Sequence, residues 1–161
     1  MPTIDLLADH PDLVHEVGWL RWREWGLGDP KPDEWIAVTR REAGRDRLPI
    51  TLVAIDDEGR AAGAVGLDEE DDALTGDERD SRSPWLVGMV VRGDRRGQGV
   101  GLALVRALEI LAESRGHDRV WVVTGAPAVG FYRACGWVAV QELVTAKEGL
   151  SSTALASALR R

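Results

Sequence analysis

The chain has 161 residues, of which 44% are hydrophobic and 29% are charged, so it is long enough for one domain with a substantial core and is typical of a soluble globular protein. Its net charge of −7 argues against a general nucleic-acid-binding role, and no apolar run approaches the ~20 residues of a membrane span. The single cysteine excludes an internal disulfide, and the N-terminus lacks a signal-peptide pattern, which together predict a cytoplasmic protein.

The first half of the chain predicts a strand, two helices and a hairpin. Gly26 follows the first amphipathic stretch as a helix stop, and Pro32 suits the first turn of the next helix. Gly59 lies in the polar turn between two apolar runs, as expected for a hairpin. The predicted elements are a strand at 4–8, helices at 11–25 and 31–44, and hairpin strands at 48–55 and 61–67.

The negative charge is concentrated in one segment. Residues 68–83 contain eight acids and two arginines, which gives this segment −6 and leaves about −1 for the rest of the chain. The segment has no apolar periodicity, so we expect a mobile, solvated loop.

The second half predicts a regular alternation of strands and helices. Gly116 and Gly136 each follow a helical pattern and end it, and Pro127 suits a helix start. The predicted elements are strands at 85–91, 120–123, 137–144 and 153–159, and helices at 100–115 and 127–135.

The stretch from Ser83 to Gly101 carries the strongest functional signal. An apolar strand, 85–91, leads into three arginines and three glycines, and a helical pattern follows. Glycines allow backbone N–H groups to point at an anion, and a helix N-terminus adds positive potential. The guanidinium groups of Arg92, Arg95 and Arg96 favour a pyrophosphate as the ligand.

Two common nucleotide-binding fingerprints do not fit these glycines. The dinucleotide pattern G-x-G-x-x-G/A fails because Leu102 or Leu104 stands at its last position in the two registers. The phosphate loop of NTPases requires G-K-S/T, whereas Gly101 is followed by Leu102 and Ala103.

The string from Arg96 to Gly101 instead matches the pattern Q/R-x-x-G-x-G/A. It resembles the acyl-CoA pyrophosphate loop of the GCN5-related N-acetyltransferase (GNAT) superfamily. The resemblance implies acetyl-CoA as co-substrate, without a metal. The loop residues that would bind it are Arg96, Gly97, Gln98, Gly99, Val100, Gly101 and Leu102.

The resemblance also gives a backbone role to the strand before the loop. In the superfamily this strand splays from its parallel neighbour, its free N–H and C=O groups pair with the pantetheine arm, and one N–H polarises the acetyl carbonyl. Counting back from Arg96, these positions are Met89, Val90 and Val91. The alternative is that this segment is an ordinary core strand. The two interpretations are compatible, because the expected contacts with the pantetheine arm use only the backbone of the strand.

A second segment, Ala128 to Trp137, resembles the superfamily motif A-x-x-F/Y-Y-x-x-x-G-F/W. There the tyrosine lies over the thioester sulfur and protonates the departing thiolate, so the resemblance makes Tyr132 the catalytic residue. A phenol with a pKa near ~10 can donate to, or hydrogen-bond, a thiolate whose thiol has a pKa near ~8.5. The alternative is that Tyr132 is a core residue whose hydroxyl is hydrogen-bonded within the protein. The superfamily often has an asparagine seven residues earlier, where this chain has Gly125 beside Thr124.

The order of the predicted elements indicates an α/β (α+β) fold, with a mixed central sheet of about seven strands flanked by four helices. The superfamily uses the same order. The resemblance covers nearly the whole chain and is strongest from Pro84 to Val138. It implies a single-domain GNAT fold, with residues 1–161 forming one N-acetyltransferase domain.

Tryptophans are unusually frequent in the two N-terminal helices. Trp19, Trp22 and Trp25 are spaced by three residues, so they lie on one side of the first helix, at positions that shift gradually around its axis. Trp35 follows in the second helix. The simplest interpretation is that they belong to the core. In the superfamily these helices form one wall of the acceptor site, where tryptophans would suit a cationic amine through cation–π contacts.

The sequence does not identify a general base, because residues 85–91 contain no acid and no histidine. Asp68, Glu69, Glu142 or a relayed water remain candidates. The three histidines and Cys135 show no metal-ligand spacing, so no metal site is predicted, and Cys135 is interpreted as buried filler.

These features predict an N-acetyltransferase that moves an acetyl group from acetyl-CoA to a primary amine by direct attack in a ternary complex. The acceptor is a small-molecule or peptide amine, and the acidic segment favours a cationic one. The tryptophan-rich N-terminus is similar to a bacterial branch of unassigned substrate. The alternatives are a non-catalytic acyl-CoA-binding regulatory module and a nucleotide-phosphate-binding protein outside the superfamily. No nucleic-acid or membrane partner is predicted, and a homodimer remains open.

Overall fold

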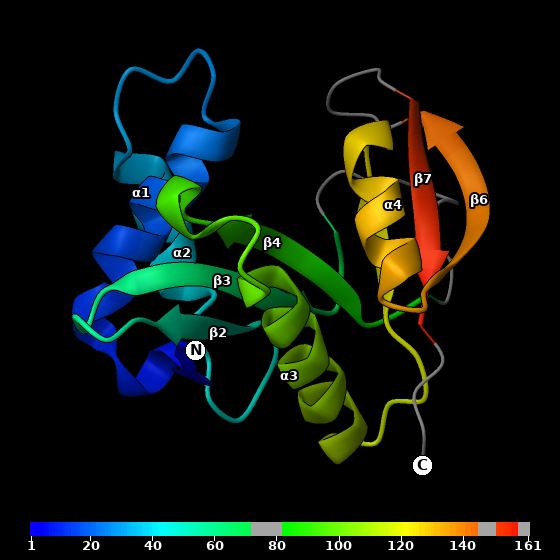
Figure 1. Cartoon of the computed structure of the whole chain (residues 1–161), viewed down its shortest axis with the longest axis horizontal. Helices are drawn as coiled ribbons and strands as arrows, with labels where there is room; N and C mark the ends of the chain where they lie inside the picture. The colour runs from blue at the N-terminus through cyan, green and yellow to red at the C-terminus, as the bar shows by residue number, and fades with distance from the viewer. Residues whose placement is uncertain (72–81, 145–150, 158–161) are drawn as a thin grey trace. The chain divides into compact units, whose positions relative to one another are not determined.

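The computed structural model describes residues 1–71, 82–144 and 151–157 of the chain (Figure 1). Most of the acidic segment predicted as a loop lies outside these residues. Within them, seven strands and four α-helices follow one another in the predicted order. The strands are β1 (Thr3–Leu6), β2 (Ile50–Ile55), β3 (Ala61–Asp68), β4 (Trp85–Val91), β5 (Trp121–Thr124), β6 (Val138–Val144) and β7 (Ser151–Ala156). The helices are α1 (Val14–Trp25), α2 (Asp33–Arg41), α3 (Val100–Ser114) and α4 (Ala126–Ala134).

The strands follow the order β1-β2-β3-β4-β5-β7-β6 in the sheet. β2 pairs antiparallel with β1 and with β3, whereas β4 pairs parallel with β5 through Trp85 and Trp121. β7 pairs antiparallel with both β5 and β6. The sheet is therefore mixed, and the predicted fold class is confirmed.

The chain divides into two compact units, and β4 and α3 contribute to both. The first unit contains Met1–Leu67 and Gly88–Leu108, and the second contains Asp68–Val87 and Glu109–Arg161. The predicted phosphate loop belongs to the first unit, together with the end of β4 that leads into it.

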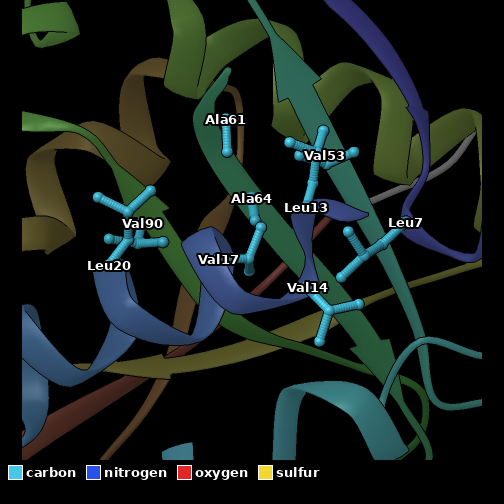
Figure 2. Packing of buried hydrophobic residues seen from close by; sticks show 9 residues of the cluster. All are labelled: Leu7, Leu13, Val14, Val17, Leu20, Val53, Ala61, Ala64 and Val90. Carbon is cyan, nitrogen blue, oxygen red and sulfur yellow. The ribbon is translucent and has the colours of Figure 1, made fainter. Parts of the chain in front are cut away.

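The first unit is held together by an apolar cluster between α1 and the strands (Figure 2). On α1, Val14, Val17 and Leu20 recur every three residues and so share one face of the helix. They pack with β-strand side chains such as Val53 and Val90, all less than a tenth exposed. This packing fixes α1 beside the end of β4.

The N-terminal tryptophans are not core residues, so the simplest interpretation of the sequence was wrong. Trp19 is 37% and Trp25 43% exposed. The Trp25 ring stacks on Trp35 with centroids 6.5 Å apart, and the indole N–H groups of Trp22 and Trp35 donate to Asp29. The apolar face of α1 is filled by smaller aliphatic residues, which leaves the indoles on the outer side with polar partners.

The second unit has its own apolar centre around α4, β6 and β7. Tyr132 and Trp137 are 4% and 3% exposed, and Leu155 of β7 is fully buried. The Trp137 indole donates to the Glu109 carboxylate at 3.3 Å. This unit therefore buries the predicted catalytic tyrosine among aromatic neighbours.

Gly18 allows α1 and α2 to approach closely, and we expect Gly18→Ala to destabilise the protein. A Cβ at this position would lie 2.6 Å from the backbone Cα of Ile36, so the two helices would have to move apart. We expect a loss of about 1–3 kcal/mol from overpacking, which outweighs the ~1 kcal/mol that alanine contributes as a better helix former. Chemical denaturation measures the difference.

Gly130→Ala in α4 is the matched control. Gly130 is exposed, and a Cβ there would meet no atom within 4 Å. We expect it to raise stability by up to ~1 kcal/mol. A Gly18→Ala variant as stable as Gly130→Ala would contradict the close helix contact.

Candidate functional site

The connection between β4 and α3 has the geometry of an anion-binding loop. A single 3-10 turn, Gly93–Arg95, follows β4. Gly97 and Gly99 then adopt left-handed conformations with φ of +74° and +84°, which favour glycine, and α3 starts at Val100. The predicted glycine-rich turn is therefore present at the N-terminus of a helix.

The loop presents a row of unused backbone donors. The N–H of Ala103 donates to the Gly99 carbonyl at 3.0 Å and makes the first hydrogen bond of α3. Among the described parts of the chain, the N–H groups of residues 97–102 find no acceptor. Successive free N–H groups at a helix N-terminus are suited to phosphate oxygens, so the loop fits the diphosphate of acetyl-CoA.

A buried carboxylate anchors this loop to the β2–β3 hairpin. The Asp56 side chain is only 2% exposed and accepts hydrogen bonds from Arg92 at 2.8 Å and from the backbone N–H of Arg60 at 3.0 Å. These hydrogen bonds lower the pKa of Asp56 to about 2, and the bond from Arg92 has the largest effect. Arg95 adds a longer contact of 3.4 Å to the Asp56 oxygen that accepts from Arg92. Two of the three arginines predicted beside a pyrophosphate are thus bound to Asp56.

Arg96 lines a pocket at the end of β4. The pocket has a volume of about 340 Å³ and lies between α1 and the β4–α3 loop. Arg96 pairs with Glu24 of α1 at 2.9 Å and donates through Nε to the Val91 carbonyl at 3.1 Å. Val90 and Val91 line the same pocket, so the structure brings together three of the residues predicted to bind the co-substrate.

Helix α1 supplies several residues of this pocket. Glu24, which the sequence analysis did not single out, is a carboxylate beside the end of β4, and Trp19, which was considered for the acceptor site, forms part of the wall. The guanidinium of Arg23 lies 5.0 Å from the Trp19 ring centroid, which is within range of a cation–π contact. No local motif connects these positions with the loop, because they lie about seventy residues earlier in the chain.

Tyr132, the predicted catalytic residue, belongs to the second unit. Its ring lies edge-on to Phe131, with centroids 5.0 Å apart, and 5.5 Å from Trp137. Burial raises the pKa of the phenol, and the neighbouring Cys135 contributes in the same direction. The hydroxyl therefore stays protonated over the physiological pH range and is available as a hydrogen-bond donor.

The three acidic candidates for the general base occupy two places in the structure. Asp68, at the end of β3, accepts the backbone N–H of Glu69 at 2.7 Å. Glu142 of β6 lines a pocket of about 480 Å³ in the second unit, together with Arg133 of α4. Among the described residues, no group of three or more His, Cys, Asp or Glu side chains is arranged to hold a metal ion, and none of their helices is long and apolar enough to cross a membrane.

Comparison with protein families identifies the chain. The model of the Acetyltransferase (GNAT) family matches residues 14–137. The chain belongs to the GNAT acetyltransferase family. It is therefore an acetyl-CoA-dependent N-acetyltransferase, with acetyl-CoA as co-substrate. No curated protein sequence gives a significant match.

Solved acetyltransferase structures share the fold over nearly the whole chain. An aminoglycoside 6'-N-acetyltransferase complexed with coenzyme A is 17% identical, with a TM-score of 0.78 over 99% of this chain and 98% of that one. The enzyme of the same name from Enterococcus faecium is 17% identical, with a TM-score of 0.75 over 99% and 98%. A spermidine N-acetyltransferase chimera, formed from the Vibrio cholerae protein and a second protein, is 17% identical, with a TM-score of 0.71 over 98% and 96%. At these identities the likeness establishes the fold alone.

The Asp56 anchor gives a pH-dependent prediction. Because its folded pKa is lowered to about 2, Asp56 contributes stability that is present above its unfolded pKa near ~4 and is lost as the pH falls towards 2. We expect Asp56→Asn to lose about 1–3 kcal/mol at pH 7, and the gap to wild type to narrow between pH 4 and pH 2. Urea unfolding at several pH values measures this.

Asp57→Asn is the control, because Asp57 is the exposed neighbour in the same turn. It should change stability by less than ~0.5 kcal/mol at every pH. An Asp56→Asn deficit that stays constant down to pH 2 would show that the carboxylate charge is not what anchors the loop.

Proposed function

We propose that the chain transfers the acetyl group of acetyl-CoA to a primary amine by direct attack in a ternary complex, and that residues 1–161 act as one N-acetyltransferase domain. The observation that carries the proposal is the loop after β4, whose free N–H groups from residue 97 to 102 fit a diphosphate. The pocket beside it joins Val90, Val91 and Arg96 to helix α1.

In this proposal the backbone holds the acyl donor. The diphosphate binds at residues 96–102, and the pantetheine arm pairs with the backbone of Met89, Val90 and Val91. Arg96 exchanges its contact with Glu24 for the phosphate, since its side chain is more than half exposed and its partners among the described residues are a surface carboxylate and one carbonyl.

The chemistry requires one bond to form and one to break. The neutral amine nitrogen attacks the thioester carbonyl, and the carbonyl oxygen becomes an oxyanion in the tetrahedral intermediate. The C–S bond then breaks, and the products are the N-acetylated amine and the thiol of CoA, which receives the proton that the amine loses. Donors aimed at the oxyanion and at the leaving sulfur lower the barrier.

We propose that Tyr132 acts on the leaving sulfur mainly as a hydrogen-bond donor. Its raised pKa makes full proton transfer to a thiolate unfavourable but keeps the O–H bond intact for donation. The burial of its ring among Phe131 and Trp137 limits the orientations of the ring and so the position of the hydroxyl oxygen.

We propose a cationic amine as the acceptor. Trp19 and Trp25 are substantially exposed on α1, and Glu24 adds a carboxylate to the wall of the pocket beside β4. Exposed indole rings and carboxylates together attract ammonium groups through cation–π and charge interactions. The similar structures include enzymes named for aminoglycosides and for spermidine, which are polycationic amines.

Acetyl-CoA turnover by thiol release tests this function. We expect turnover with at least one member of a panel of polyamines, aminoglycosides, simple amines and short peptides, and the highest kcat/KM for a polycationic member. Binding of acetyl-CoA without turnover of any acceptor would favour the non-catalytic regulatory module. Binding of ATP or NAD in place of acetyl-CoA would refute the proposal.

Tyr132→Phe separates catalysis from binding. It should lower kcat roughly 10- to 100-fold, the effect of one lost hydrogen bond to a charged group, and leave the Kd for CoA unchanged. Phe131→Leu is the packing control, because it disturbs the same aromatic cluster but keeps the hydroxyl. Equal kcat for Tyr132→Phe and wild type would remove Tyr132 from the mechanism.

A further inference from the structure

Gly88 lies within β4 and has a left-handed conformation. Its φ is +60°, and it stands immediately before Met89, the first of the strand residues assigned to the acyl donor. A Cβ at Gly88 would lie 2.8 to 2.9 Å from three atoms of the Arg21 guanidinium. Both the backbone conformation and the contact with Arg21 therefore require glycine at this point.

Arg21 of α1 is a buried cation. Its side chain is 4% exposed, and burial lowers its pKa while the nearby Glu42 carboxylate opposes that shift. Nη1 donates to Thr39 and Glu42, at 3.3 and 3.2 Å, and Nε donates to the Gly88 carbonyl at 3.2 Å. Within the described chain, Nη2 is buried without a hydrogen-bond partner.

Stability alone does not account for this arrangement. A buried ion pair loses several kcal/mol of solvation for each ion, and apolar residues of similar volume commonly replace such pairs without loss. A buried donor without a partner adds a further cost. What Arg21 provides, and an apolar residue would not, is a hydrogen bond to one particular carbonyl of β4.

That carbonyl controls the direction of the next N–H. The Gly88 C=O and the Met89 N–H belong to one planar, trans peptide, so they point in opposite directions. Holding the carbonyl toward Arg21 therefore directs the Met89 N–H away from Arg21. A cation on the carbonyl oxygen also withdraws electron density from the peptide, which strengthens its N–H as a donor.

The alternation of β4 places the Met89 N–H on the edge that faces away from β3. The N–H of Arg92 donates to Ala62 of β3 at 2.8 Å. Because N–H groups alternate between the two edges of a strand, those of Val91 and Met89 point to the opposite edge. The Val91 carbonyl also points there, since it belongs to the same planar, trans peptide as the Arg92 N–H and so points the opposite way. In the strand order this edge faces β5, but β4 pairs with β5 at Trp85, before Gly88, so we assign the later part of this edge to the acyl donor.

We propose that Arg21 is a positioning residue for acetyl transfer, which orients and polarises the Gly88–Met89 peptide so that the Met89 N–H donates to the thioester carbonyl oxygen and to the oxyanion formed from it. This inference rests on the function proposed above. Arg21 does not touch the substrate, and acts through the backbone.

The affinity ratio of CoA to acetyl-CoA tests the proposal, because the two ligands differ only in the acetyl group. In Arg21→Met we expect the Kd for CoA to stay within about threefold of wild type, while any preference for acetyl-CoA over CoA disappears. We also expect kcat to fall roughly 10- to 100-fold, less than the full loss of an oxyanion donor. Arg21→Lys should recover part of kcat, since an ammonium can still donate to the Gly88 carbonyl.

Val53→Ala controls for lost stability, because Val53 is a fully buried core residue of the same unit. It should lower the melting temperature and leave the affinity ratio and kcat unchanged. An Arg21→Met variant with the wild-type ratio and kcat would overturn the proposal. If the wild-type protein turns over no acceptor, the proposed function is refuted. The ratio of the two Kd values still tests whether Arg21 positions the Gly88–Met89 peptide.

The hydrogen bond from the Met89 N–H can also be tested in the wild-type protein, without any variant. In ¹⁵N-labelled protein, acetyl-CoA should move the Met89 amide proton downfield relative to its position with CoA, as expected for a new hydrogen bond to the acetyl carbonyl. The Val91 amide should have nearly the same shift with both ligands. Identical Met89 shifts with the two ligands would overturn the proposal.

Discussion

The position of the loop between β4 and α3 depends on the buried carboxylate of Asp56. This carboxylate lies in the turn between β2 and β3 and binds Arg92, the first residue after β4. Arg92 in turn donates to the Ala61 carbonyl at 2.8 Å, so the start of the loop is fixed to the hairpin from two directions. This anchor helps to fix the point from which the glycines at 97 and 99 present their N–H groups.

This anchor changes how the positive charge of the loop is used. Three arginines within five residues suggest three phosphate ligands. However, the Arg92 side chain is largely buried against Asp56, and Arg95 binds the same Asp56 carboxylate. Arg96 is the exposed member, with 59% of its side chain accessible, and its partner Glu24 is also exposed. Most of the attraction for a diphosphate therefore falls to the backbone N–H groups and the helix dipole, which need no side chain.

The sequence predicted the local features well and the long-range ones poorly. The bounds of β4, 85–91, were predicted as observed, because an apolar run between a proline and an arginine cluster is a local pattern. The positive φ of Gly88 and its contact with Arg21 were not predicted, since these residues are 67 positions apart and belong to no shared motif. The tryptophans were misplaced because their hydrophobicity was taken as burial, although each indole also carries a polar N–H.

Arg21 and Asp56 solve the same physical problem at the two ends of one short segment. A backbone that binds a ligand must leave its own N–H groups unpaired, and unpaired peptides lose the hydrogen bonds that normally hold a strand straight. Arg21 fixes the peptide at the start of this segment through the Gly88 carbonyl, and Asp56 fixes its end through the side chain of Arg92, in each case with a charged side chain that reaches from another element. Apolar packing fills space but does not select the direction of a carbonyl or an N–H. Buried charges are therefore found here, beside the backbone groups assigned to the acyl donor, where direction matters more than the cost of burial.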